Sequence, residues 1–168
     1  MTTFIIAAIT ADGFIAKNSN HLASWTSKED KKFFVEKTKQ AGVVIMGLNT
    51  YKTIGKPLPD RLNIVYSRTE KSLEGVEVTE DEPSKLLNNL AGRGFKEVAI
   101  TGGAQIYTMF MEADLVDKVY LTVEPILFGN GMSLFTKYLD IKLRLRSTQK
   151  LNDNTVALEY DVVHDRLL

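Results

Sequence analysis

The sequence predicts a single α/β domain whose mostly parallel central sheet is flanked by helices and ends in an antiparallel C-terminal hairpin. Short, near-continuous apolar runs rich in β-branched residues alternate with helical or turn-rich stretches, as in buried parallel strands covered by helices. The last run instead alternates apolar and polar positions after a polar turn at residues 152–154, which indicates an antiparallel edge. A chain of 168 residues with 44% hydrophobic residues can bury one core, so one domain is expected.

The expected strands and helices follow from composition and from the residues that open and close them. Six apolar runs predict parallel strands at residues 3–9, 42–46, 62–67, 76–78, 97–101 and 118–124. The alternating run at residues 155–163 predicts the antiparallel strand. Helices are expected where a capping residue or a proline opens the segment, at residues 27–40, 83–91 and 104–111.

Composition argues against several classes of function. Lysine and arginine total 21, as do aspartate and glutamate, so no net charge attracts nucleic acid or an anionic membrane. The chain has no cysteine and two histidines, so we expect neither disulfides nor a dedicated metal site. The apolar start at residues 4–9 is too short to span a bilayer and follows no basic residue, so a cytoplasmic protein is expected.

Asp30 is the first candidate for chemistry. Asp30 and Phe34 are four residues apart and therefore share one face of the expected helix. If this face lines a pocket, burial raises the pKa of the acid and suits it to hold or pass a proton. The alternatives are an exposed first-turn acid favoured by the helix dipole, or the partner of Ser27 in a capping box.

Two turns that run from a strand through glycine into a helix are candidates for phosphate binding. Gly47 directly follows Met46, the last residue of one apolar run, and Gly102 with Gly103 follows another apolar run. At such turns a ligand approaches the backbone closely and free helix amides face it. The paired glycines lack the GxGxxG pattern and the downstream acid of a standard Rossmann site, so a simple tight turn stays open as an alternative.

Arg61 ends a rigid extended segment, residues 56–61, that contains two prolines. The planar guanidinium of arginine matches the geometry of a carboxylate. A single arginine is also common on solvated surface, so these residues alone leave its role open.

Taken in chain order, these segments resemble the dihydrofolate reductase family over nearly the whole chain. The resemblance rests on Ile6-Ala7-Ala8 followed by Asp12 to Ile15, Trp25 before the acidic helix, Met46-Gly47-x-Asn49-Thr50-Tyr51-x-x-Ile54-Gly55-x-Pro57-Leu58-Pro59-x-Arg61-x-Asn63-Ile64-Val65, Gly102-Gly103 and Tyr120-Leu121-Thr122. The shared order makes the match specific. It implies a dihydrofolate-reductase-like fold over residues 1–168.

The resemblance implies roles for the acid and its neighbours. Asp30 would be the buried carboxylate that hydrogen-bonds the pteridine ring and supports protonation of its N5. Thr122 would hold Asp30 in place, and Trp25 would help fix a water near the ring. The implied substrate-binding residues are Ile6 and Ala8, then Phe34, Ile54 and Leu58 around the aminobenzoyl group, and Arg61 at the glutamate α-carboxylate.

The resemblance also implies NADPH as the cofactor and a cis peptide bond between Gly102 and Gly103. The diphosphate would lie near Thr50 and the first amides of the following helix, and the nicotinamide near Ala8, Ile15 and Tyr107. The implied cofactor-binding residues are Ala8, Ile15, Gly47, Asn49, Thr50, Ser67, Arg68, Thr69, Gly102, Gly103, Ala104, Gln105, Ile106 and Tyr107.

Four positions depart from the family pattern. Leu48, Ala104 and Gln105 stand where many members have an arginine, a third glycine and a basic residue. Arg68, Thr69 and Lys71 would supply charge and hydrogen bonds for a 2′-phosphate, so NADPH is preferred and NADH stays open. Lys31 stands where an apolar residue commonly lines the folate pocket.

The expected function is reduction of 7,8-dihydrofolate to 5,6,7,8-tetrahydrofolate by hydride transfer to C6 and protonation at N5. The alternative enzyme is a riboflavin-pathway reductase of the same superfamily, acting on a ribosylaminopyrimidine phosphate, which residues 11–16, 25–30 and 124–135 resemble. A non-catalytic nucleotide-binding module is a third reading, since fold alone does not fix function. We expect a small-molecule substrate, no nucleic acid, no membrane, and a monomer rather than a dimer.

Overall fold

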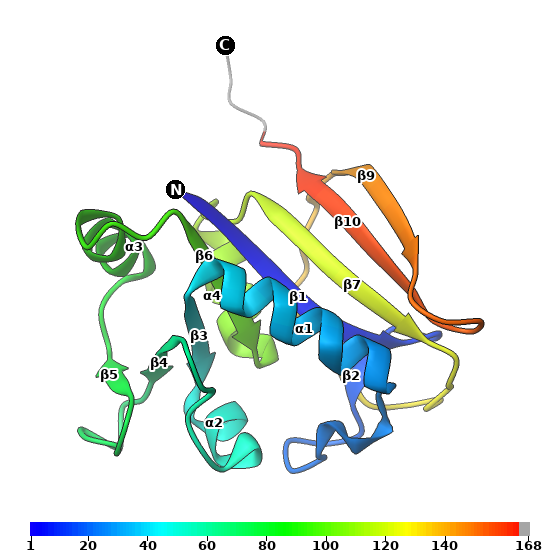
Figure 1. The fold of residues 1–168 in the computed structure, drawn as a ribbon, viewed down its shortest axis with the longest axis horizontal. Helices are drawn as coiled ribbons and strands as arrows, with labels where there is room; N and C mark the ends of the chain where they lie inside the picture. The colour runs from blue at the N-terminus through cyan, green and yellow to red at the C-terminus, as the bar shows by residue number, and fades with distance from the viewer. Residues whose placement is uncertain (165–168) are drawn as a thin grey trace.

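A mostly parallel sheet of eight strands forms the centre of the protein (Figure 1). The computed structural model describes residues 1–164. The strands are β1 (Thr2–Thr10), β3 (Val43–Gly47), β4 (Leu62–Tyr66), β5 (Glu77–Thr79), β6 (Glu97–Gly102), β7 (Lys118–Glu124), β9 (Leu143–Lys150) and β10 (Val156–Val162). Their order is β5-β4-β3-β6-β1-β7-β10-β9, parallel from β5 to β7 and antiparallel at β10 and β9. The predicted α/β class, parallel sheet and antiparallel C-terminal hairpin are confirmed.

Helices cover both faces of this sheet. They are α1 (Lys28–Ala41), α2 (Leu48–Ile54), α3 (Pro83–Gly92), α4 (Ala104–Glu112) and a short 3-10 helix, η1 (Ala23–Trp25). A second, two-stranded sheet pairs β2 (Phe14–Ala16) with β8 (Met132–Ser133). Figure 1 shows α1 and α4 on opposite sides of the central strands. No helix within residues 1–164 is long and apolar enough to cross a membrane.

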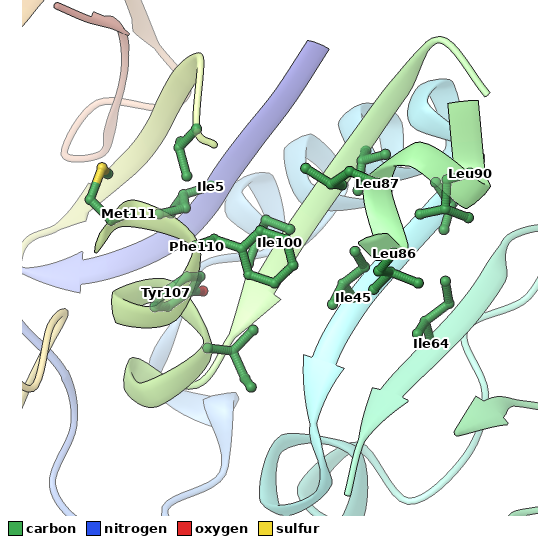
Figure 2. Packing of buried hydrophobic residues seen from close by; sticks show 14 of the residues in the cluster. Ile5, Ile45, Ile64, Leu86, Leu87, Leu90, Ile100, Tyr107, Phe110 and Met111 are labelled. Atoms are coloured by element: carbon green, nitrogen blue, oxygen red, sulfur yellow. The ribbon is translucent and has the colours of Figure 1, made fainter. Parts of the chain in front are cut away.

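Two hydrophobic cores lie on the two faces of the sheet. One joins strand residues such as Ile5 and Ile45 to α3 and α4, where Leu90 and Phe110 are fully buried (Figure 2). The other packs α1 and α2 against the opposite face and contains Phe4 among its buried residues. Because successive strand residues point to opposite faces, a strand buried on both faces reads as a continuous apolar run.

Sequence and structure differ most where burial is weak. Strands β2, β8 and β9 and the full helix α2 were not predicted from the sequence, and β5 begins one residue later than predicted. All eight residues of β9 are exposed, so the strand gains no apolar burial and depends on its pairing with β10. The predicted strand start at Gly42 is wrong because this residue is the C-cap of α1.

Candidate functional site

The carboxyl ends of five parallel strands bring the predicted site residues to one edge of the sheet. Thr122 on β7 lies opposite Ala8 on β1, and Gly102 on β6 lies opposite Met46 on β3. Ser67 directly follows β4. In open α/β sheets ligands bind in the crevice outside these carboxyl ends. The edge is therefore the candidate active site.

Asp30 lies in the first turn of α1 and is buried, with 8% of its surface exposed. The hydroxyl groups of Thr122 and Thr26 lie close enough to its carboxyl group to lower its pKa. Thr122 is itself 1% exposed on β7, so the acid is held from the facing strand. The interpretation of Asp30 as a buried acid is confirmed, and the alternative of an exposed first-turn acid is wrong.

The environment of Asp30 favours the protonated acid more than water does. Burial raises the pKa of Asp30, because a charged carboxylate is poorly solvated in the protein. The hydrogen bonds from Thr122 and Thr26 lower the pKa of Asp30, the charge of Glu124 raises it, and Lys31 lowers it. The net pKa shift is upward, as expected of a group that holds or passes a proton.

The predicted capping box at the start of α1 forms only in part. The Ser27 hydroxyl accepts a hydrogen bond from the Asp30 backbone N–H at 3.1 Å. The Ser27 backbone N–H, however, donates to Glu124 at 2.9 Å and not to Asp30. Glu124 is the last residue of β7, as predicted, but no role in the site was predicted for it. Its burial depends on α1 and on the turn before β10, which no local pattern reveals.

The glycine turn after β6 is built for close approach to the backbone. The Gly102–Gly103 peptide bond is cis, as the family resemblance implies. Gly103 is the N-cap of α4 and makes no side-chain cap bond, since glycine has no side chain. A Cβ atom added at Gly103 would lie 3.4 Å from the Thr50 hydroxyl oxygen, and one added at Gly47 would lie 3.2 Å from Ile106. A phosphate group suits such a turn, because the first amides of a helix have no intrahelical acceptor.

Tyr107 connects the two sides of the site. It is buried on α4, and its hydroxyl donates a hydrogen bond to the carbonyl oxygen of Ile6 at 2.9 Å. Burial raises the pKa of the Tyr107 phenol, and the charge of Asp30 raises it further. The Ile6 side chain belongs to the core beneath α1, so its backbone is what the site can use.

Three apolar side chains form an apolar wall beside α1. Phe34, Ile54 and Leu58 are half-buried and all pack against the core cluster beneath α1. Arg61 lies at the helix end, where its Nε donates to the Pro59 carbonyl at 2.9 Å and its Nη1 to the Thr38 hydroxyl at 2.6 Å. These bonds hold the guanidinium in one orientation.

The turn after β4 and the loop before α1 complete the predicted set. The buried Ser67 hydroxyl accepts hydrogen bonds from the backbone N–H groups of Thr69 and Glu70, while Arg68 and Thr69 are exposed. Trp25 packs edge-to-face on Phe128 at 5.2 Å between ring centroids, so it contacts the segment after β7.

The loop before α1 is held against the segment after β7 by Asp12 and Phe128. No role was predicted for either residue from the sequence. The Asp12 carboxylate accepts hydrogen bonds from the backbone N–H groups of Phe128 and Gly129, at 3.2 and 2.7 Å. His21 contacts the Phe128 ring at 5.5 Å between centroids. Residues 1–164 contain no cluster of three or more acidic or histidine side chains placed to hold a metal ion.

Comparison with known proteins identifies a family and a related sequence. A model of the dihydrofolate reductase family matches residues 2–164. Dihydrofolate reductase type 3 of Salmonella typhimurium is 34% identical over 166 residues, covering 95% of this chain and 96% of that protein. The family match and this relative indicate an oxidoreductase.

Solved structures share the fold at lower identity. A protein of Shewanella sp. PV-4 assigned to riboflavin biosynthesis matches with a TM-score of 0.84 and 22% identity, covering 98% of this chain and 100% of that one. A diaminohydroxyphosphoribosylaminopyrimidine deaminase/5-amino-6-(5-phosphoribosylamino)uracil reductase of Thermotoga maritima matches with a TM-score of 0.78 and 18% identity, covering 96% of this chain and 56% of that one. At these identities the likeness establishes the fold.

Proposed function

Because the chain belongs to the dihydrofolate reductase family, we propose that it catalyses the NADPH-dependent reduction of 7,8-dihydrofolate to 5,6,7,8-tetrahydrofolate. The observation that carries this proposal is the buried Asp30, whose pKa is raised and whose carboxyl group is held by Thr122. A carboxyl group in this state can hydrogen-bond a pteridine ring and support protonation at its N5. The oriented Arg61 at the other end of the same helix supports a substrate that also carries a carboxylate.

Different residues of the substrate side contact different parts of dihydrofolate. Asp30 orients the ring and supports its protonation, Thr122 orients Asp30, and Trp25 helps to fix a water near the ring. The apolar wall defined above flanks the aminobenzoyl group and excludes water from it. Arg61 pairs with the glutamate α-carboxylate through its planar fork.

The residues of the cofactor side fit a dinucleotide. When bound, NADPH supplies the hydride that reaches C6. The Gly103 turn and Thr50 would hold the diphosphate, because a Cβ atom at Gly103 would fill the space beside the Thr50 hydroxyl. Ser67, Arg68 and Thr69 would receive the 2′-phosphate, since two of these side chains are exposed beside the capped turn.

The decisive experiment follows the loss of NADPH absorbance when dihydrofolate is added to the purified protein. Turnover that requires both compounds supports the proposal. Binding of NADPH without turnover of dihydrofolate contradicts it, and absence of NADPH binding favours a non-catalytic module. The same titration with NADH tests cofactor preference.

A second candidate is reduction of a ribosylaminopyrimidine phosphate. It is favoured by Lys31, an exposed cation directly beside Asp30 where the family pattern has an apolar residue. A phosphate group on the substrate would gain from this charge. Turnover of the phosphorylated pyrimidine without turnover of dihydrofolate would select this candidate.

A further inference from the structure

A second buried carboxylate, Glu124, lies beside Asp30 and has no part in the proposed reaction. It ends β7 at the site edge of the sheet and is 3% exposed. A buried carboxylate is costly unless its oxygens accept hydrogen bonds. The contacts of Glu124 therefore indicate what it does.

Glu124 accepts three hydrogen bonds from two other elements. One oxygen accepts from the backbone N–H of Ser27 at 2.9 Å and from the Ser27 hydroxyl at 2.7 Å. The other oxygen accepts from the Thr155 hydroxyl at 3.2 Å, just before β10. Because the Ser27 hydroxyl proton points to Glu124, its lone pairs remain free to accept from the Asp30 N–H.

In these contacts Glu124 takes the place that Asp30 would have in a capping box. In a complete box the acidic side chain three residues after the cap returns to the N–H of the cap residue. Here that acidic residue is Asp30, but the Ser27 N–H is already bound by Glu124. The Asp30 carboxyl instead meets the hydroxyls of Thr122 and Thr26 in the site.

We propose that Glu124 is a positioning residue that occupies the helix cap in place of Asp30 and so directs the Asp30 carboxyl group into the active site. Its kinetic consequence rests on the proposed function, whereas its effect on Asp30 does not. The negative charge of Glu124 raises the pKa of Asp30, as burial does. The other groups that act on Asp30 are the hydroxyls of Thr122 and Thr26 and the charge of Lys31 on its own helix, all of which lower its pKa. Tyr107 on α4 also faces Asp30, whose charge raises the pKa of the Tyr107 phenol.

The test is the Glu124→Gln substitution, read by carbon NMR titration of the Asp30 carboxyl group without substrate. Glutamine keeps the size of the side chain and an oxygen for Ser27, but it removes the charge. We expect Asp30 to titrate at lower pH in E124Q than in the wild type. Turnover should lose its high-pH limb at correspondingly lower pH, because Asp30 loses its proton sooner.

Glu29→Gln is the matched control. Glu29 is also a carboxylate of the first turn of α1, but it is exposed and bonds only to Asn152 among the described contacts. The substitution removes the same negative charge from a solvent-exposed position, where water and salt screen its effect on Asp30. We expect the Asp30 carboxyl group to titrate at the same pH in E29Q as in the wild type.

Glu124→Asp separates geometry from charge. It keeps the negative charge but retracts the carboxylate from Ser27, so Asp30 is free to return to the cap N–H and leave Thr122. We expect the Asp30 titration to move to lower pH in E124D as well. Wild-type titration of Asp30 in E124D would overturn the proposal, even if E124Q shifts the titration through the lost charge and dihydrofolate turnover is intact. A shifted titration in a protein that does not reduce dihydrofolate would support the positioning role and reject only the proposed function.

Discussion

The two halves of the candidate site differ in composition: one consists of side chains and the other mainly of backbone. The half that we propose binds the substrate consists of side chains: a buried acid at one end of α1 and an oriented guanidinium at the other. The half that we propose binds the cofactor consists mainly of backbone, at Gly47 and at the Gly102–Gly103 turn. Removing a side-chain functional group should therefore impair the substrate half. Adding a Cβ atom at a glycine should impair the cofactor half.

The difference also separates what each half can control. Side chains carry charge, so the substrate half responds to pH through Asp30, whose pKa is raised by burial. Backbone amides do not titrate, and their geometry is set by conformations that only glycine adopts readily. Four substitutions test this division, in order of decreasing expected effect.

Asp30→Asn should have the largest effect, a loss of turnover of about 10²–10⁴-fold, the usual contribution of a positioned acid. Asparagine keeps the shape of the side chain and remains polar, but it cannot supply a proton. The measurement is NADPH oxidation with dihydrofolate, and wild-type turnover at neutral pH would contradict the role of Asp30. Asp153→Asn, an exposed site, is the matched control.

The same substitution should not destabilise the protein at neutral pH. Because the pKa of Asp30 is raised in the folded state, that state binds the proton more tightly than the unfolded chain. The wild type therefore loses stability as pH rises from the unfolded pKa through the folded one, and D30N lacks this loss. Urea unfolding at pH 7 should show D30N at least as stable as the wild type. A less stable D30N would contradict the pKa direction.

Arg61→Ala should raise the KM for dihydrofolate about 10- to 100-fold, because a charge-assisted hydrogen bond contributes roughly 1.5–3 kcal/mol. Reduction of a dihydropterin without the glutamate should change little, since no carboxylate reaches this position. Steady-state kinetics with the two substrates makes the comparison. Equal losses on both would reject the carboxylate assignment.

Gly102→Ala tests the cofactor half. The glycine has a φ of +115°, and an added Cβ would lie 3.1 Å from the Tyr107 hydroxyl oxygen. We expect about 1–3 kcal/mol of lost stability, the usual cost of such a backbone conformation, and weaker NADPH binding. Thermal unfolding and NADPH fluorescence titration measure both effects.

Gly94→Ala is its control, since Gly94 also has a positive φ, +92°, but open space around its Cβ position. It should lose stability without losing NADPH affinity. If G102A binds NADPH as tightly as G94A does, the glycine turn is not part of the cofactor site.

Thr38→Val should have the smallest effect. It removes the hydroxyl that accepts from Arg61 but leaves the guanidinium and its bond to Pro59. Thr38 acts on the substrate only by orienting Arg61, through one of the two hydrogen bonds of the guanidinium. We therefore expect a loss of about 0.5–1.5 kcal/mol, so the KM for dihydrofolate should rise roughly two- to tenfold, with kcat unchanged. A KM rise as large as that of R61A would show that Thr38 acts by more than orienting Arg61.

Sequence predicted the strongly buried elements well and the weakly buried ones poorly. The strands beneath the helices were predicted because burial on both faces demands apolar residues in succession. Strand β9 was missed because both of its faces are exposed, so its residues carry no burial signal. Strands β2 and β8 were missed because two or three residues are too few for a period to show.

The sequence by itself determined the parallel strands, the start of α1 at Ser27, the glycine turns, and the presence of one acid and one arginine in a recognisable order. These features depend on local chemistry or on spacing along the chain. Only the tertiary structure decided which acids are buried. Asp30 and Glu124 are enclosed while Glu29 is exposed, because the bond from Ser27 to Glu124 joins residues 97 positions apart. Contacts over that distance depend on how the strands are ordered in the sheet, which no local pattern specifies.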